Sequence, residues 1–216
     1  MRQLFQQELH ELQDNLVKVA ELVHTAIKDA VRAFNKSDVE VAEQVIASDT
    51  TIDEAVRALD EQAIAILARQ SPVAGDLRLV VSALRISSSL ERMGDMAEHL
   101  AQLARLRFPE KVVPKPIRPI FKEMGEKDVA MSKMLVELLR TNDLALAEQI
   151  QLDDDRIDAL HRSVFDAVLG EKWEGGTEAT IDSTLASRYF ERFADHAVSI
   201  SRRVTYLATG ETETLH

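Results

Sequence analysis

The stretch DVEVAEQV at residues 38–45 returns as DLALAEQI at residues 143–150, 105 positions further along the chain. A second stretch, LERMGD at residues 90–95, returns as FERFAD at residues 190–195, 100 positions further along. Matching stretches that recur in the same order at nearly the same offset indicate an internal duplication of about 105 residues. The five-residue difference predicts a shorter turn before the last helix of the second copy.

Apolar residues recur every three or four positions through most of the chain, as at Leu9, Leu12, Leu16 and Val19. This period is typical of amphipathic helices, and we find no alternation long enough for a strand. Seven glycines, five prolines and 5% aromatic residues also disfavour a turn-rich β fold. Breakers and capping residues predict six helices, at residues 3–34, 38–69, 72–107, 117–140, 143–169 and 178–208.

Four of the five prolines lie between residues 108 and 119, which we interpret as a linker. The sequence therefore predicts an all-α fold, a tandem repeat of two three-helix bundles made of six long antiparallel helices. We expect the first bundle at residues 1–108, and the linker with the second bundle at residues 109–216. Two arrangements remain open: the halves pack on each other, or the second and third helices run almost continuously.

Composition excludes several functions. The 216 residues include no cysteine, which rules out a disulfide scaffold, a zinc finger, an iron–sulfur cluster and a thiol nucleophile. With 26 Lys and Arg against 37 Asp and Glu, the net charge is −11, which disfavours nucleic acid as a partner. No apolar run approaches 18 residues and the N-terminus lacks a signal-like apolar stretch, so we expect a cytoplasmic protein without a membrane span.

Acidic residues interrupt the row of apolar residues along one face of several helices, here called the seam of the helix. In the second helix the seam runs through Val45 and Ile52, but the position between them is Asp49. A second acid follows one helical turn after it, and the third helix carries another pair with the same spacing. The second half of the chain repeats the pattern. The eight acids are Asp49, Asp53, Glu91, Asp95, Asp154, Asp158, Glu191 and Asp195.

Four carboxylates that meet between two helices repel one another, by roughly 4 kcal/mol for each contact at 4 Å and an effective dielectric constant of 20. Protonation or bound cations would relieve this repulsion. Oxygen ligands suit hard or borderline cations, so we predict a metal centre in each half, with Fe, Mn, Mg or Ca favoured over Zn. The alternative is a solvated acidic face neutralised by Arg57, Arg92 and Arg192.

For other polar residues, a structural role is an alternative to a functional one. His161 falls on an apolar seam, where a hydrogen-bonded core histidine is the more frequent outcome than a metal ligand. Glu21 and His24 have the spacing of a di-iron helix motif, but only one copy is present. Trp173 is expected to fix the loop before the last helix. No nucleophile elbow, glycine-rich phosphate loop or catalytic triad spacing occurs, so we predict no catalytic residue.

Three stretches, QSPVAGDLR at residues 70–78, LERMGD at 90–95 and RYFERFADHA at 188–197, resemble signatures of the PhoU family, which regulates phosphate transport. The resemblance implies two three-helix bundles that bind metal clusters, with iron foremost, through the eight acids named above. Family members often carry Asn four residues after the last acid of each motif. Here those positions hold His99, a candidate nitrogen ligand, and Ser199, which would leave its centre one ligand short or completed by water.

The resemblance also implies a function. The protein would be a non-enzymatic, cytoplasmic negative regulator of the phosphate-starvation response. Through protein contacts it would couple the ATPase subunit of a phosphate ABC transporter to a sensor histidine kinase, at the inner face of the membrane. A homodimer is expected. Two alternatives remain: a di-metal carboxylate enzyme of the helical-bundle type, and a metal-free helical adaptor.

Overall fold

A computed structural model describes residues 2–210 of the chain. Within this range the fold is all-α and contains no strand, as predicted. No helix in the described part of the chain is both long and apolar enough to cross a membrane. The elements in order are α1 (Arg2–Lys36), α2 (Val39–Gln70), α3 (Ala74–Arg107), the 3-10 turn η1 (Lys115–Ile117), α4 (Arg118–Thr141), α5 (Leu144–Val168) and α6 (Gly176–Thr209).

The duplicated stretches begin two equivalent helices because each opens with an aspartate cap. The Asp38 side chain accepts a hydrogen bond from the backbone N–H of Val41 at 3.2 Å, which starts α2. Asp143 accepts one from the N–H of Ala145 at 3.1 Å, which starts α5. A capping carboxylate satisfies a donor that the first helical turn leaves unpaired.

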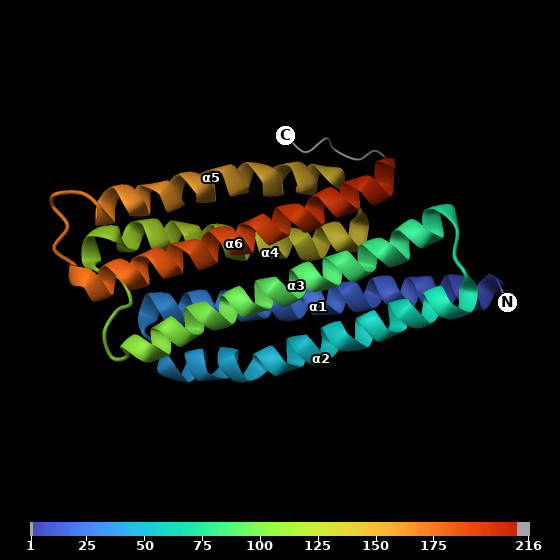
Figure 1. Ribbon diagram of the computed structural model, residues 1–216, viewed down its shortest axis with the longest axis horizontal. Coiled ribbons are helices and arrows are strands. Elements are labelled where there is room, and N and C mark those ends of the chain that lie inside the picture. Colours follow the sequence, from blue (N-terminus) through green and yellow to red (C-terminus); the bar gives the residue numbers. More distant parts are fainter. Residues whose placement is uncertain (1, 211–216) are drawn as a thin grey trace.

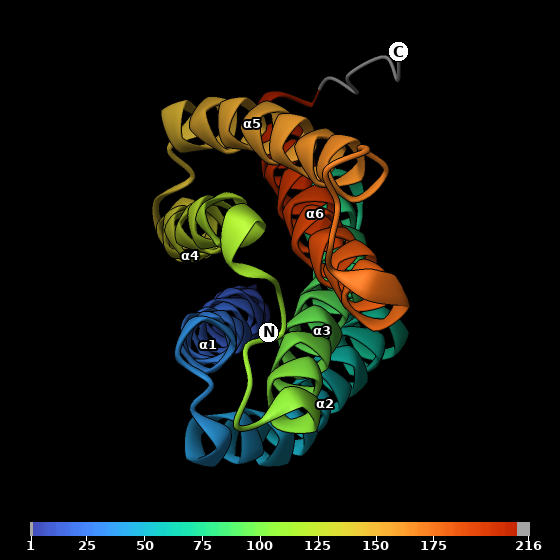
Figure 2. The same cartoon turned by 90° about the vertical axis from the view of Figure 1, so that its left-hand side faces the viewer.

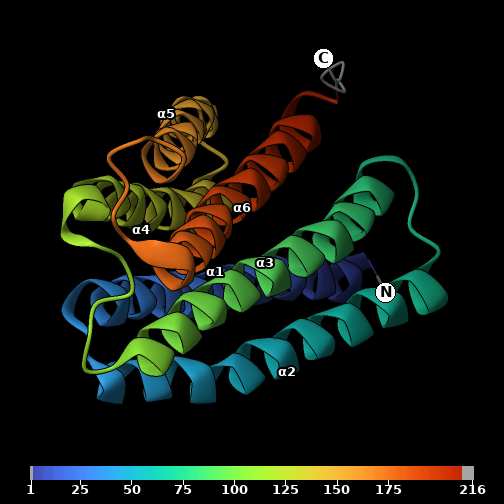
Figure 3. The same ribbon diagram turned by 60° about the vertical axis from the view of Figure 1, so that its left-hand side comes forward.

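The predicted start of the third helix at residue 72 is wrong by two residues. Ser71 takes the left-handed conformation that ends α2, and Val73 is extended, with φ −128° and ψ 158°. Pro72 therefore lies in the turn rather than in the helix, which begins at Ala74. The turn reverses the chain, so α3 runs antiparallel to α2 (Figure 3). The nearly continuous arrangement of these two helices is thereby excluded.

The six helices form two three-helix bundles that lie side by side (Figure 1). Helices α1, α2 and α3 pack against one another, and α4, α5 and α6 do the same. Between the bundles, α1 packs on α4 and α3 packs on α6, while α2 and α5 lie at opposite outer edges (Figure 2). The predicted tandem repeat of antiparallel three-helix bundles is confirmed.

One apolar core runs through both bundles. Where α1 ends and α4 begins, the ring of Phe34 in α1 lies 5.7 Å from the ring of Phe121 in α4 and 5.7 Å from that of Phe190 in α6. Gly125 of α4 faces Val31 of α1 so closely that an added Cβ would lie 2.7 Å from a valine methyl group. The interface between the bundles is thus packed as tightly as a protein interior.

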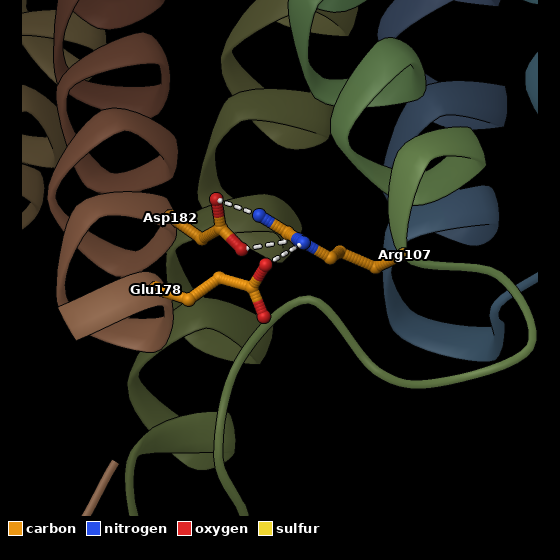
Figure 4. Close-up of polar contacts among 3 residues, drawn as sticks. All are labelled: Arg107, Glu178 and Asp182. Atoms are coloured by element: carbon orange, nitrogen blue, oxygen red, sulfur yellow. Dashed lines mark hydrogen bonds and ion pairs between the residues drawn. The ribbon is translucent and has the colours of Figure 1, made fainter. Parts of the chain in front are cut away.

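An ion-pair cluster joins the bundles at one end of the molecule. Arg107, in the last turn of α3, donates from Nε to Asp182 Oδ2 at 2.6 Å and from a terminal nitrogen to Asp182 Oδ1 at 3.1 Å (Figure 4). The same guanidinium also pairs with Glu178, one turn earlier in α6 (Figure 4). Because Asp182 is buried, this two-pronged contact supplies the hydrogen bonds that its carboxylate would otherwise lack.

Candidate functional site

The first carboxylate cluster lies where α2 packs on α3. Asp49 is half-buried, and its pKa is raised from 3.8 to about 6, first by burial and then by nearby carboxylates. Those carboxylates include the predicted partners on both helices, Asp53, Asp95 and Glu91. The largest charge effect comes from Glu98, which the sequence analysis did not select. The seam acids of α2 and α3 are therefore close enough to repel one another.

Gly94 allows this close approach of α2 and α3. A Cβ added to Gly94 would lie 3.3 Å from two side-chain carbons of Ile52 and 3.6 Å from Asp49 Oδ1. The glycine thus leaves room for the Asp49 carboxylate to lie against the backbone of α3. In the second bundle the corresponding residue is Ala194, which is fully buried.

The second cluster repeats the arrangement between α5 and α6. Burial is the largest cause that raises the pKa of Asp154 from 3.8 to about 7, followed by Asp158, Asp195, Asp155 and Glu191. One oxygen of Asp154, Oδ1, is buried without a hydrogen-bond partner. Burial also raises the pKa of Glu191 and of Asp195, although Asp195 is exposed overall. A neutral or cation-bound state of this cluster is therefore favoured over four free anions.

Arginines neutralise one acid in each cluster. Arg92 donates to Asp95 at 2.9 Å, three residues along α3. Arg188 pairs with Glu191, three residues along α6. Both guanidinium groups are about half-exposed, at 54% and 47% for the side chains. The neutralising arginines of the alternative interpretation are thus present in part: Arg92 forms an ion pair, and the charge of Arg192 acts on Glu191 and Asp195 together with that of Arg188.

The donor chemistry of the two clusters fits a hard cation, because it consists of carboxylate oxygens and includes the unpartnered Oδ1 of Asp154. The side chains do not already form a coordination shell: within residues 2–210, no three His, Asp or Glu side chains are arranged so that they could hold a metal ion. A bound cation would require side-chain rotations, among them release of Asp95 by Arg92 and of Glu191 by Arg188.

His99 faces the other bundle. Its ring lies 4.9 Å from the ring of Tyr189 in α6, with the two planes tilted by 30°. Its Nδ1 atom is buried and has no hydrogen-bond partner. The role of His99 as a nitrogen ligand stays a prediction. Ser199, the residue at the matching position of α6, is exposed.

Two acids near the clusters were missed by the sequence analysis, although patterns in the sequence point to both. Glu98 follows Glu91 by seven residues and so continues the same face of α3. Asp128 interrupts the apolar seam of α4 between Met124 and Met131, just as Asp49 interrupts that of α2. Asp128 is fully buried, neither of its oxygens has a partner, and burial followed by Asp154 raises its pKa well above 3.8.

The two histidines at helix seams make structural contacts. His161 Nδ1 lies 3.0 Å from the hydroxyl of Ser187, which agrees with its expected role as a hydrogen-bonded core residue. His24 Nδ1 lies 2.8 Å from the hydroxyl of Ser132 in α4, and Glu21 pairs with Arg140. Both members of the Glu21 and His24 motif are therefore engaged in contacts between α1 and α4.

Fold and site together define a class of protein: an all-helical tandem of three-helix bundles with a carboxylate cluster in each bundle. The PhoU domain family matches the chain twice, at residues 16–104 and 121–204. This chain therefore belongs to the PhoU family, as its signature stretches indicated.

Relatives and solved structures agree with this assignment. The chain is 39% identical over 210 residues to the phosphate-specific transport system accessory protein PhoU homolog 2 of Mycobacterium tuberculosis, covering 97% of this chain and 99% of the relative. The crystal structure of PhoU from Pseudomonas aeruginosa superposes with a TM-score of 0.88 at 28% identity, over 96% of this chain and 100% of that one. PhoU from Streptococcus pneumoniae gives 0.85 at 28% identity, over 98% and 100%.

Proposed function

We propose that this protein is a negative regulator of the phosphate-starvation response that couples a phosphate ABC transporter to a sensor histidine kinase. The observation that carries the proposal is the full-length similarity to proteins named as accessory proteins of phosphate-specific transport. A regulator of this kind acts by shifting which partner it holds. It would work in the cytoplasm, at the inner face of the membrane, through contacts with the transporter ATPase subunit and the kinase.

The partner proposal is tested in the native host. A tagged copy expressed from its own promoter is expected to capture both the ATPase subunit and the histidine kinase from phosphate-replete cells. Deletion of the gene is expected to switch on phosphate-starvation genes in the same medium, and a plasmid copy should restore repression. Capture of neither partner, together with unchanged repression in the deletion strain, would refute the proposed role.

We further propose that metal ions, with iron first and Mn, Mg, Ca or Zn as alternatives, brace the facing helices of each bundle. The supporting observations are the raised pKa values of Asp49 and Asp154 and the unpartnered oxygen of Asp154. A cation would supply the positive charge that the crowded carboxylates lack. The residues that would hold it are the eight acids of the two clusters, with Glu98 added to the first.

Elemental analysis of chelator-free protein tests the metal proposal. At least one metal ion per chain is expected, and Asp154→Asn should lower the content. The matched control is Asp166→Asn, which changes an exposed acid of the same helix. A metal content well below one ion per wild-type chain would instead support the metal-free adaptor, and equal content in both variants would exclude Asp154 as a ligand.

A homodimer is the remaining part of the proposal. Several large apolar side chains of α5, its C-cap residue and α6 are exposed and would be covered in a dimer, among them Leu152, Leu169 and Ile181. Light scattering after size-exclusion chromatography is expected to give twice the chain mass of 24.2 kDa. A mass of one chain across the micromolar range would contradict it.

A further inference from the structure

A groove between α1, the linker and α4 differs from the rest of the molecule in its charge. It has a volume of about 890 Å³, within the range of sites for small molecules. The linker passes beside the C-terminal end of α1 on its way to α4 (Figure 2). Apolar residues such as Phe34 and Val112 form part of the lining. Six cations also line the groove: Lys28, Arg32, Lys36, Lys111, Arg118 and Lys122.

The lining includes only one carboxylate, that of Glu126, although the chain as a whole has a net charge of −11. Lys122 pairs with Glu126 at 3.7 Å, and Arg32 pairs with Asp38 at 3.0 Å. Within residues 2–210, no ion pair engages the other four cations of the groove, Lys28, Lys36, Lys111 and Arg118. The acidic chain thus lines one groove with four cations that form no ion pair among the described residues.

Two of the four cations are held in place by the backbone. The ammonium group of Lys111 donates to the carbonyl oxygen of Asn35 at 2.7 Å, and Nε of Arg118 donates to the carbonyl oxygen of Val113 at 3.0 Å. They lie close enough that Arg118, after burial, lowers the pKa of Lys111. Like charges fixed side by side repel each other, and an anion between them would remove that repulsion.

We propose that this groove binds an anion with two or more linked phosphoryl groups, carried either by a nucleotide or by a short inorganic polyphosphate. The charge of such an anion is concentrated in a small volume, as are the cations that line the groove. Its oxygens can accept hydrogen bonds from the N–H groups of Lys111 and Arg118 that do not donate to a backbone carbonyl.

A small phosphoanion suits the groove better than an acidic segment of a protein does. An acidic polypeptide spreads its carboxylates along its length, so many of them would lie outside the groove over a surface of net negative charge. A compact anion stays inside the groove, and beyond about 8 Å at physiological ionic strength the remaining acidic surface is largely screened. The site is separate from the carboxylate clusters, and its occupancy does not depend on the proposed regulatory role.

Isothermal titration calorimetry with the full-length chain tests the proposal, with tripolyphosphate and ATP as the two probes. The buffer contains EDTA, so that metal ions at the carboxylate clusters do not recruit phosphate. Saturable 1:1 binding of at least one probe is expected. Binding of ATP alone identifies a nucleotide site, and equal binding of tripolyphosphate shows that chained phosphoryl groups suffice.

Variants that each remove one positive charge test whether binding occurs in this groove. Lys28→Gln and Arg118→Gln are each expected to weaken binding about tenfold, the effect of losing one charge-assisted hydrogen bond. The matched control is Lys18→Gln, which removes an exposed cation ten residues earlier in α1 and should leave the dissociation constant within about twofold. Circular dichroism checks that each variant keeps its helices.

Three results would overturn the proposal. One is no saturable binding of either probe up to millimolar concentration. Another is an equal loss of affinity in Lys18→Gln and Arg118→Gln, which would reveal a general charge effect. The third is binding of a glutamate-rich peptide in the groove, lost in Arg118→Gln, when neither phosphoanion binds.

Discussion

At the scale of single residues, the carboxyl of Asp154 shows the cost of placing acids in a helix seam. Its pKa of about 7 lies above the ordinary 3.8, so the folded state holds this proton more tightly than the unfolded chain does. The stabilising contribution of the protonated form is complete below pH 4. It is lost as the pH rises from about 4 through the folded pKa of about 7.

A pH series on metal-free protein checks this linkage. The free energy of unfolding is expected to fall by about 1–2 kcal/mol between pH 4.5 and 7.5 on account of Asp154, a figure reduced for solvent screening of a half-buried group. Asp154→Asn should remove that part of the fall, whereas Asp166→Asn should retain it. Identical urea titrations of the two variants at both pH values would contradict the assignment.

Asp49 distinguishes a bare acid cluster from one that holds a cation. With EDTA present, Asp49→Asn is expected to melt at the same temperature as wild type or higher, because one source of like-charge repulsion is gone. With added Mn²⁺ or Fe²⁺, wild type should gain stability by mass action and the variant should gain less. Thermal melts in both buffers provide the comparison, and an equal metal-induced gain in both proteins would count against Asp49 as a ligand.

At the scale of helices, Gly125 sets the distance between α1 and α4. An alanine there would bring its Cβ to 2.7 Å from a methyl group of Val31, whose β-branched side chain has little freedom to turn away. Gly125→Ala is expected to lower the free energy of unfolding by about 1–3 kcal/mol, the usual effect of overpacking. Denaturant unfolding measures the difference.

Gly75 is the matched control for Gly125. Nothing lies within 4 Å of a Cβ added there, near the start of α3. Gly75→Ala should therefore be neutral or stabilise the chain by up to about 1 kcal/mol through helix propensity. The double variant Val31→Ala/Gly125→Ala should recover part of the loss, and no recovery would show that the contact is not the cause.

Helix positions were predictable because local signals determine them: every predicted boundary lies within two residues of the observed one. The aspartate caps at residues 38 and 143 marked two of the starts. The turn at residues 71–73 was harder to predict, because Pro72 is tolerated in a first helical turn and the left-handed Ser71 and extended Val73 appear only in the structure. Asp128 interrupts its seam alone, without a second acid one helical turn away, so it lacks the paired pattern of the other acids.

At the scale of the whole molecule, the packing of the two bundles could not be read from the sequence. Both open arrangements bury the same apolar seams, and periodicity does not say which helix covers which. The contact between Arg107 and Asp182 likewise joins residues 75 positions apart, beyond the reach of any spacing rule. The seam acids raise the pKa values of Asp49 and Asp154 through their charges, whereas their role as metal ligands stays a prediction. The arginine pairs on Asp95 and Glu191 depend on side-chain rotamers and could not be predicted.

The ion pair of Arg107 with Asp182 gives a prediction about the stability of the interface between the bundles. Arg107→Met would leave the buried Asp182 without its partner and should lower the free energy of unfolding by roughly 2–4 kcal/mol, allowing for the partial exposure of the arginine. Arg105→Met removes a neighbouring arginine whose pair with Glu43, at 3.4 Å, is exposed, so it should change stability by less than about 1 kcal/mol. Equal losses in urea unfolding would show that Asp182 does not need Arg107.

At the interface between the bundles, each inner helix packs against the equivalent helix of the other bundle: α1 against α4, and α3 against α6. Contacts between equivalent surfaces are the hallmark of twofold-symmetric dimers. The chain therefore has the arrangement of a twofold dimer whose two three-helix units are joined in one polypeptide. Because the two units share one chain, their pairing does not depend on protein concentration. The units are not identical, since the position of α6 equivalent to Glu98 holds Val198.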